Sequence, residues 1–139
     1  MSCILRFYGD FDPAPLVASL TWKKMDSWKK GDPNPHLTGE PRDTSGIQVV
    51  VSDAGSEDQP VQVFDAIDFL TRESTPIEMI MKIAGVKSGD LDFGVAQRNK
   101  PMYCVDFPAR LVELAGKLGI GIQVSLYAVA GVGGFEEEK

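Results

Sequence analysis

The alternation of apolar and polar side chains in the extended segments most constrains the fold of this chain. Residues 122–128 alternate between an apolar and a mixed series, and residues 3–8 and 91–96 do the same. Successive side chains of a strand point to opposite faces of a sheet, so each segment has one apolar and one mixed face. This pattern is typical of an antiparallel-rich sheet that is covered on one side only.

Apolar residues at helical spacing occupy the segments between these strands, at 13–20, 60–70, 75–84 and 108–118. The predicted order is strand, helix, two strands, two helices, two strands, helix, strand, with residues 102–105 as the last strand but one. We therefore predict an α+β fold, a two-layer sandwich. It would contain an antiparallel-rich sheet of about five to six strands with helices packed on one face.

The same periodicities predict which side chains are buried. The stripe expected to face the core from the second helix, with Asp65 and Asp68 in water, is Val61, Phe64, Ile67 and Leu70. Six residues of the last helix and strand are expected to be buried together: Leu111, Leu114, Leu118, Ile122, Val124 and Leu126. Seven residues are expected to line the uncovered face: Arg6, Tyr8, Gln48, Asp92, Gln123, Ser125 and Tyr127.

Length and composition bound the class of protein. The 139 residues suit one domain, predicted at residues 1–130, followed by a flexible Gly/Glu tail at residues 131–139. No apolar run reaches the ~20 residues of a membrane span, and the first residues lack the pattern of a signal peptide. Cys3 and Cys104 have no disulfide or zinc-ligand spacing. We interpret them as reduced core or sheet residues of a cytoplasmic protein.

The charge is unevenly distributed along the chain. A net charge of −6 and a pI near 4.7 argue against general nucleic-acid binding. The acidic excess lies beyond residue 50, where one window without Lys or Arg contains Asp53, Glu57, Asp58, Asp65 and Asp68. Such a window is either an ordinary solvated face or a surface that attracts a basic partner.

Residues 22–36 form the most distinctive segment, because they contain both tryptophans and the only histidine of the chain. Pairs of lysines flank a short strand that ends at Trp28, and the prolines at 33 and 35 then end regular structure. Two interpretations stay open. The segment is either a strand and a rigid loop pinned by the Trp28 ring, or a recognition loop.

Several of these motifs carry a resemblance to a known family. The segments are Tyr8-Gly9-Asp10-Phe11-Asp12-Pro13, Ser27-Trp28-Lys29-Lys30-Gly31-Asp32-Pro33, and Phe107-Pro108 through Leu118-Gly119 into residues 122–127. Together they resemble the bacterial family called "domain of unknown function 4279". The resemblance spans nearly the whole chain and implies a compact bacterial α+β domain. It supplies no catalytic residues.

Catalytic chemistry has little support in the sequence. His36 stands alone in a proline-rich loop, with Asp32 four residues before it as a possible orienting group. Neither cysteine has an adjacent base, and the supply of His and Cys is too small for a transition-metal site. We therefore predict no enzyme activity, no cofactor and no metal, and rank a small hydrolase third among the possible functions.

Binding to a protein partner is the function that we predict first. The expected protein is a small acidic inhibitor or immunity-type protein that masks a toxin or defence enzyme, anchored by aromatic residues and steered by charge. The alternative is a sensor that binds a small molecule or peptide on the open sheet face. The predicted partner-binding residues are Trp28, Lys29, Lys30, Asp32, His36, Asp53, Glu57, Asp58, Asp65 and Asp68.

Overall fold

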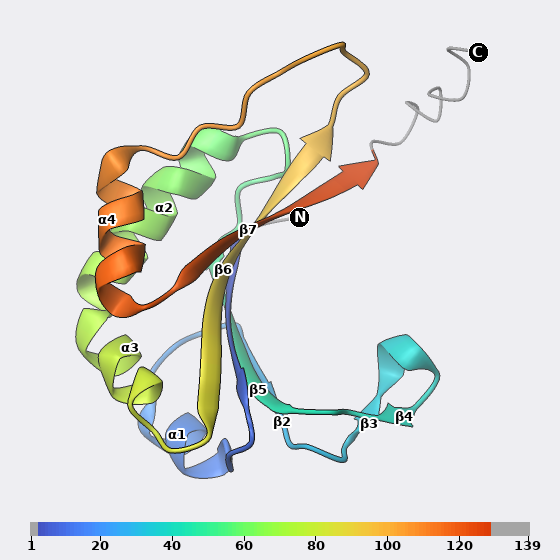
Figure 1. The fold of residues 1–139 in the computed structure, drawn as a ribbon, viewed down its shortest axis with the longest axis vertical. Coiled ribbons are helices and arrows are strands. Elements are labelled where there is room, and N and C mark those ends of the chain that lie inside the picture. The colour runs from blue at the N-terminus through green and yellow to red at the C-terminus, as the bar shows by residue number, and fades with distance from the viewer. Residues whose placement is uncertain (1–2, 129–139) are drawn as a thin grey trace.

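A five-stranded sheet forms one layer of the protein (Figure 1). The computed structural model describes residues 3–128, so the predicted tail at residues 131–139 lies outside the described residues. The strands, in spatial order, are β2 (Met25–Trp28), β5 (Ser45–Ser52), β1 (Cys3–Gly9), β6 (Val86–Gln97) and β7 (Gly121–Ala128). All neighbouring pairs are antiparallel except β6 and β7, which are parallel and connected through a helix.

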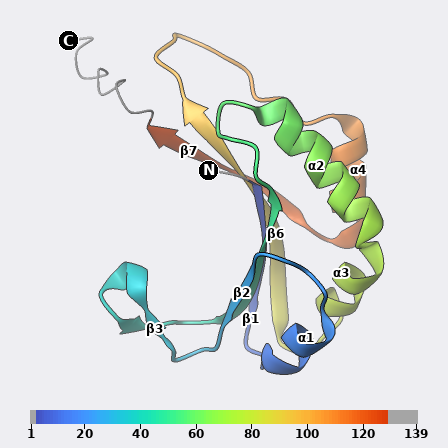
Figure 2. The ribbon, with the colours of Figure 1, turned by 180° about the vertical axis from the view of Figure 1, so that it is seen from behind.

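Four α-helices of residues 3–128 form the second layer: α1 (Ala14–Ser19), α2 (Gln59–Arg72), α3 (Ser74–Met81) and α4 (Ala109–Leu118). Figures 1 and 2 show all four on one side of the sheet, and no α-helix of the described residues lies on the opposite side. The predicted fold class, an α+β sandwich with helices on one face, is confirmed. The fully buried side chains between the layers include Leu5, Phe7, Leu91 and Phe93 of the central strands.

The buried stripe of α2 agrees with the prediction at Leu70, which is fully buried, but differs from it in the first turns of the helix. Phe64 is 71% exposed and Val61 is also exposed, whereas Val63 and Ala66 are buried. Gln62 is buried as well, because its amide donates hydrogen bonds to the carbonyls of residues 54, 55 and 94. A glutamine whose amide donors are bonded can occupy a position that periodicity assigns to an apolar residue.

The C-terminal half also departs from the prediction. Leu111 and Leu118 are buried as expected, but Val124 and Leu126 are exposed. The reason is that β7 is an edge strand whose far end runs away from the helices (Figure 1). The strand predicted at residues 102–105 is irregular chain in the structure.

The two cysteines differ from each other. Cys104 is exposed on the irregular segment, not buried in a sheet. Cys3 is fully buried in β1, and this burial raises the pKa of its thiol, with the charges of Asp92 and Asp65 adding to the effect. The Cys3 thiol is therefore protonated and inert.

Strands β2 and β5 form a hairpin with a long tip. We call residues 31–42 the arm. It contains β3 (Pro33–Asn34), the 3₁₀ helix η1 (Pro35–Leu37) and β4 (Glu40–Pro41). Two backbone hydrogen bonds close its base, from the N–H of Gly31 to the carbonyl of Arg42 and from the N–H of Arg42 to the carbonyl of Asp32. The arm projects from the sheet on the side opposite the helices (Figures 1 and 2).

Candidate functional site

The face of the sheet opposite the helices is polar, and we call it the open face. Arg6 and Tyr8 alternate along β1 with the buried Leu5 and Phe7, and the strand register places Gln48 of β5 opposite Arg6. The same alternation places further polar side chains of β6 and β7 on this face: Asp92, Gln123, Ser125 and Tyr127.

A row of hydrogen bonds crosses the open face over four strands. The Nη1 group of Arg6 donates to Oδ2 of Asp92 at 2.7 Å, and its Nε donates to Oε1 of Gln48 at 3.3 Å. The hydroxyl of Ser125 donates to the other carboxylate oxygen of Asp92 at 2.8 Å. Asp92 is only 5% exposed, so this row binds the strands together and satisfies a buried charge.

The environment shifts the pKa values of Arg6, in this row, and of the neighbouring Tyr8. Burial by itself lowers the pKa of Arg6, but the hydrogen bond to Asp92 and the charge of that carboxylate leave it above its usual value. Burial raises the pKa of the Tyr8 phenol by more than the neighbouring Arg6 lowers it. Arg6 is thus held as a cation and Tyr8 as a neutral phenol.

Trp28 ends β2 on the open face. Its ring lies against the backbone of Gly46, the residue opposite it in β5, where an added Cβ would overlap the ring. Tyr8 is the aromatic neighbour at 6.5 Å between ring centroids. The guanidinium carbon of Arg42, at the base of the arm, lies 4.5 Å from the centroid of the Trp28 ring, a cation–π contact.

These groups surround a cavity of about 490 Å³ between the arm and the sheet, which we call the open-face hollow. Its walls come from β1, β2, β5 and the arm, and its lining residues are Ile4, Arg6, Tyr8, Asp26, Trp28, His36, Arg42 and Gln48. The volume lies within the range of small-ligand sites.

The two arginines of the open-face hollow differ in their ion pairing. Arg6 is paired with Asp92. Arg42 has no ion pair within residues 3–128, and its buried Nε has no hydrogen-bond partner there. The hollow therefore presents a cationic group that stacks on Trp28 and is bonded to no acidic side chain of that part of the chain.

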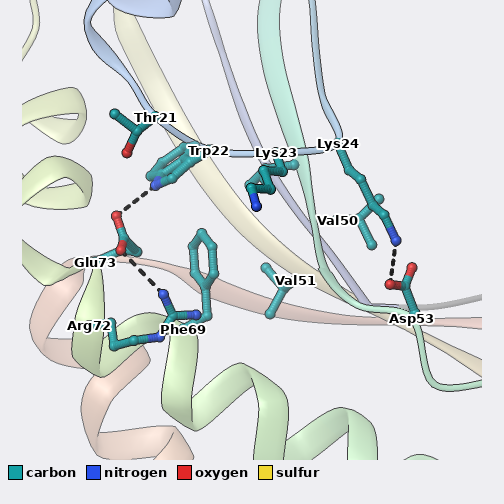
Figure 3. Close-up of a pocket in the computed structure, with 11 residues that line it drawn as sticks. Thr21, Trp22, Lys23, Lys24, Val50, Val51, Asp53, Phe69, Arg72 and Glu73 are labelled. Atoms are coloured by element: carbon teal, nitrogen blue, oxygen red, sulfur yellow. Dashed lines mark hydrogen bonds and ion pairs between the residues drawn. The ribbon is translucent and has the colours of Figure 1, made fainter.

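A second cavity, of about 400 Å³, lies between β5 and α2 beside Trp22, and we call it the Trp22 hollow (Figure 3). Its polar groups mostly bond to each other. The indole N–H of Trp22 donates to Glu73 at 2.8 Å, Arg72 is near Glu73, and Lys24 pairs with Asp53. Lys23 has no ion pair within the described residues. Because most of its polar groups are already bonded, this cavity offers a ligand less than the open-face hollow does.

The ten predicted partner-binding residues do not form one surface. Trp28 and His36 meet at the open-face hollow. Lys29, Lys30 and Asp32 lie exposed in the turn after β2, where Asp32 accepts the N–H of Lys29 and Lys30 lies 3.7 Å from Asp10.

The predicted acidic residues lie on the loop before α2 and on α2 itself, which covers the other face of the sheet. Several are already bonded within the protein. Asp53 pairs with Lys24, Asp68 pairs with Arg72, and Asp65 accepts the hydroxyl of Ser52 at 2.6 Å. Glu57 and Asp58 are exposed on the loop.

Sequence reasoning missed Arg42 and Asp26. Arg42 reaches Trp28 only because the arm folds back on itself, with Pro33 opposite Pro41. This pairing leaves no periodic pattern in the sequence. A usable signal for Asp26 was present, since it shares the parity of Trp28 in a predicted strand and therefore its face.

Comparisons with known proteins add no assignment: no family model matches the chain, and no curated protein or solved structure shows detectable similarity. The resemblance to the family of unknown function stays a prediction. Within residues 3–128, no helix is both long and apolar enough to cross a membrane.

Proposed function

We propose that this protein is a non-enzymatic binding module whose ligand, a small molecule or a short peptide segment, occupies the open-face hollow. The observation that carries this proposal is the convergence of Trp28, Arg42 and His36 with the polar face of β1 and β5 around one cavity. A concave site with aromatic walls and a few oriented polar groups is the usual form of a ligand site.

The polar groups of the open-face hollow support a binding role. Arg6 is fixed by Asp92 and Gln48, which suits a preformed wall of a binding site. His36 also lines the hollow, and its backbone N–H donates to Oδ1 of Asn34 in the arm.

The two tryptophans provide the test. Each indole N–H gives its own signal in a proton–nitrogen correlation spectrum, and the Trp28→Phe variant assigns them. Ligands from a library of small molecules and short peptides are expected to shift the Trp28 signal and to leave the Trp22 signal in place. Ligands that shift only the Trp22 signal would contradict this site, and so would a library without any ligand.

A second candidate function is the acidic inhibitor or immunity-type protein, and the outer surface of α2 favours it. Phe64 is 71% exposed there, with Val61 and Asp68 as neighbours one helical turn away on either side. An exposed aromatic ring beside acidic groups combines an anchor with charge steering towards a basic partner.

This second function predicts a specific pattern of capture. A partner retained from a lysate of the source organism at low salt should be lost with Phe64→Ser and weakened with Asp68→Asn. The matched control is Val112→Ser, which removes an exposed apolar side chain from α4. Equal capture by all three variants would rule out the α2 surface as the binding site.

A further inference from the structure

The chemistry of the open-face hollow points to the kind of ligand that it holds. Its two arginines differ: Arg6 donates to Asp92 at 2.7 Å and to Gln48 at 3.3 Å, so its donors are largely used. Arg42 is held by its stacking on the Trp28 ring, at 4.5 Å from the guanidinium carbon to the ring centroid. Within residues 3–128 no carboxylate pairs with it.

We infer that the ligand carries an oxyanionic group, a carboxylate or a phosphate, that binds to the guanidinium of Arg42 in the open-face hollow. This inference rests on the proposed function. The N–H groups of a guanidinium lie in its own plane, so stacking on Trp28 leaves them available. Because Nε is buried, the two Nη groups are the donors for the anion.

The stack also prepares the arginine for this role. A guanidinium packed on an aromatic ring has fewer orientations than one in free solvent, so less side-chain entropy is lost when an anion binds. Hydrogen bonds between a guanidinium and a carboxylate or phosphate are charge-assisted and directional. A neutral ligand would leave the charge of Arg42 without a counter-ion.

The other lining residues define the rest of the ligand. Ile4, Tyr8 and Trp28 supply apolar and aromatic surface for a hydrophobic body. Asp26 lines the same hollow and repels an anion, so the anionic group is expected on the arm side, beside Arg42. An aryl or alkyl carboxylate, or the corresponding phosphate, fits this arrangement.

The test compares three probes with the same ring: benzoate, phenyl phosphate and the neutral benzamide. We expect benzoate or phenyl phosphate to shift the Trp28 indole signal in a saturable manner, with the Trp22 signal as internal reference. Benzamide should bind at least about tenfold more weakly, since a hydrogen-bonded ion pair contributes that much. A preference for benzoate or for phenyl phosphate separates the two sources of the oxyanion.

Variants assign the effect to Arg42. Arg42→Gln should weaken binding of the anionic probe about tenfold or more, and Arg42→Lys should weaken it less, because it keeps the charge and loses the fork. Asp26→Asn should tighten binding by removing a repulsive charge. The matched control is Arg72→Gln, which removes an exposed arginine beside the Trp22 hollow and should leave the affinity unchanged.

The outcomes separate this inference from the proposed function. If benzamide binds as tightly as benzoate, or if Arg42→Gln has no effect, the hollow binds ligands but the oxyanion inference is wrong. Weaker binding of the anionic probe to Asp26→Asn would contradict the expected repulsion and would also overturn it. If neither the probes nor the library shifts the Trp28 signal, both proposals fail. A dispersed spectrum confirms that each variant is folded.

Discussion

Trp22 and Trp28 lie close in the sequence but on opposite faces of the sheet, and their rings contact different kinds of neighbours. Trp22 lies on the helix side of the sheet. Its ring is stacked on Phe7, with 6.4 Å between the ring centroids, and is tilted against Phe69, with 5.4 Å between the centroids. Its indole N–H donates to Glu73. Trp28 lies on the open face, against the backbone of Gly46 and beside the guanidinium of Arg42.

This difference shows that the role of an aromatic residue depends on its neighbours, and on whether their polar and charged groups already have hydrogen-bond or ion-pair partners within the protein. The partners of Trp22 are Phe7 of β1, Phe69 of α2 and Glu73 directly after α2, and they engage both its ring and its N–H. Trp28 has a neighbour, Arg42, whose charge is paired with no carboxylate of residues 3–128. A fully satisfied aromatic residue stabilises the fold, and one beside an available cation can serve a ligand.

The largest expected effect is on stability when Trp22 is truncated. Trp22→Ala should lower the free energy of unfolding by about 3 kcal/mol, because it leaves a cavity beside Phe7 and Phe69 and removes the donor to Glu73. Trp28→Ala should cost about 1 kcal/mol, mainly the cation–π contact and some packing. Urea unfolding of both variants measures the difference.

Trp22→Phe is the control for the hydrogen bond. It keeps most of the ring and loses the indole N–H, so it should cost less than Trp22→Ala, by an amount that reports the packing. Equal losses for Trp22→Ala and Trp28→Ala would remove the distinction between a structural and a binding tryptophan.

The comparison also shows how far the sequence predicts this molecule. The layers follow from local periodicity, because alternation along β1, β6 and β7 and helical spacing in α4 are properties of neighbouring residues. The exposure of Phe64 could not be predicted from local periodicity, because it depends on the hydrogen bonds that Gln62 donates to the carbonyls of residues 55 and 94.

The site was predictable only in part. Residue type singled out Trp28 and His36, and strand parity indicated the face of Arg6 and Tyr8. The stack of Arg42 on Trp28 depends on the hairpin path of the arm, which brings together residues from either side of a turn. Sequence periodicity holds no information about such pairing, so the contact between Arg42 and Trp28 was found only in the structure.

The second-largest expected effect tests whether the hydrogen bonds of the open face stabilise the fold. Asp92→Ala leaves Arg6 and Ser125 without their acceptor. It should cost about 2 kcal/mol, below the value for a fully buried pair because the Arg6 side chain is 21% exposed. The double variant Arg6→Met, Asp92→Leu should recover much of this loss, since it removes both charges. A single-variant loss below ~0.5 kcal/mol would show that the row contributes little.

The third effect in size comes from a substitution at Gly46, which should displace the Trp28 ring while keeping the tryptophan itself. In Gly46→Ala the new Cβ overlaps the indole ring, so the ring must shift away from β5. We expect a loss of about 1–2 kcal/mol from this overpacking and a shifted Trp28 indole signal, with the Trp22 signal unchanged. An unchanged Trp28 signal would mean that its ring does not lie on Gly46 in solution.

The smallest expected effect concerns the charges around the Trp22 hollow. Lys24 and Asp53 form an ion pair whose side chains are 59% and 71% exposed, and Arg72 and Asp68 form another that is exposed at both ends. Exposed pairs contribute little, so Asp53→Asn and Asp68→Asn should each change stability by less than ~0.5 kcal/mol. Neither should alter the affinity of the open-face hollow for an anion, whereas Asp26→Asn should raise it. Screening limits the reach of exposed charges to ~8 Å at physiological salt, so no change in that affinity is expected with Asp53→Asn. A change would show that long-range charge, and not contact with Arg42, controls binding.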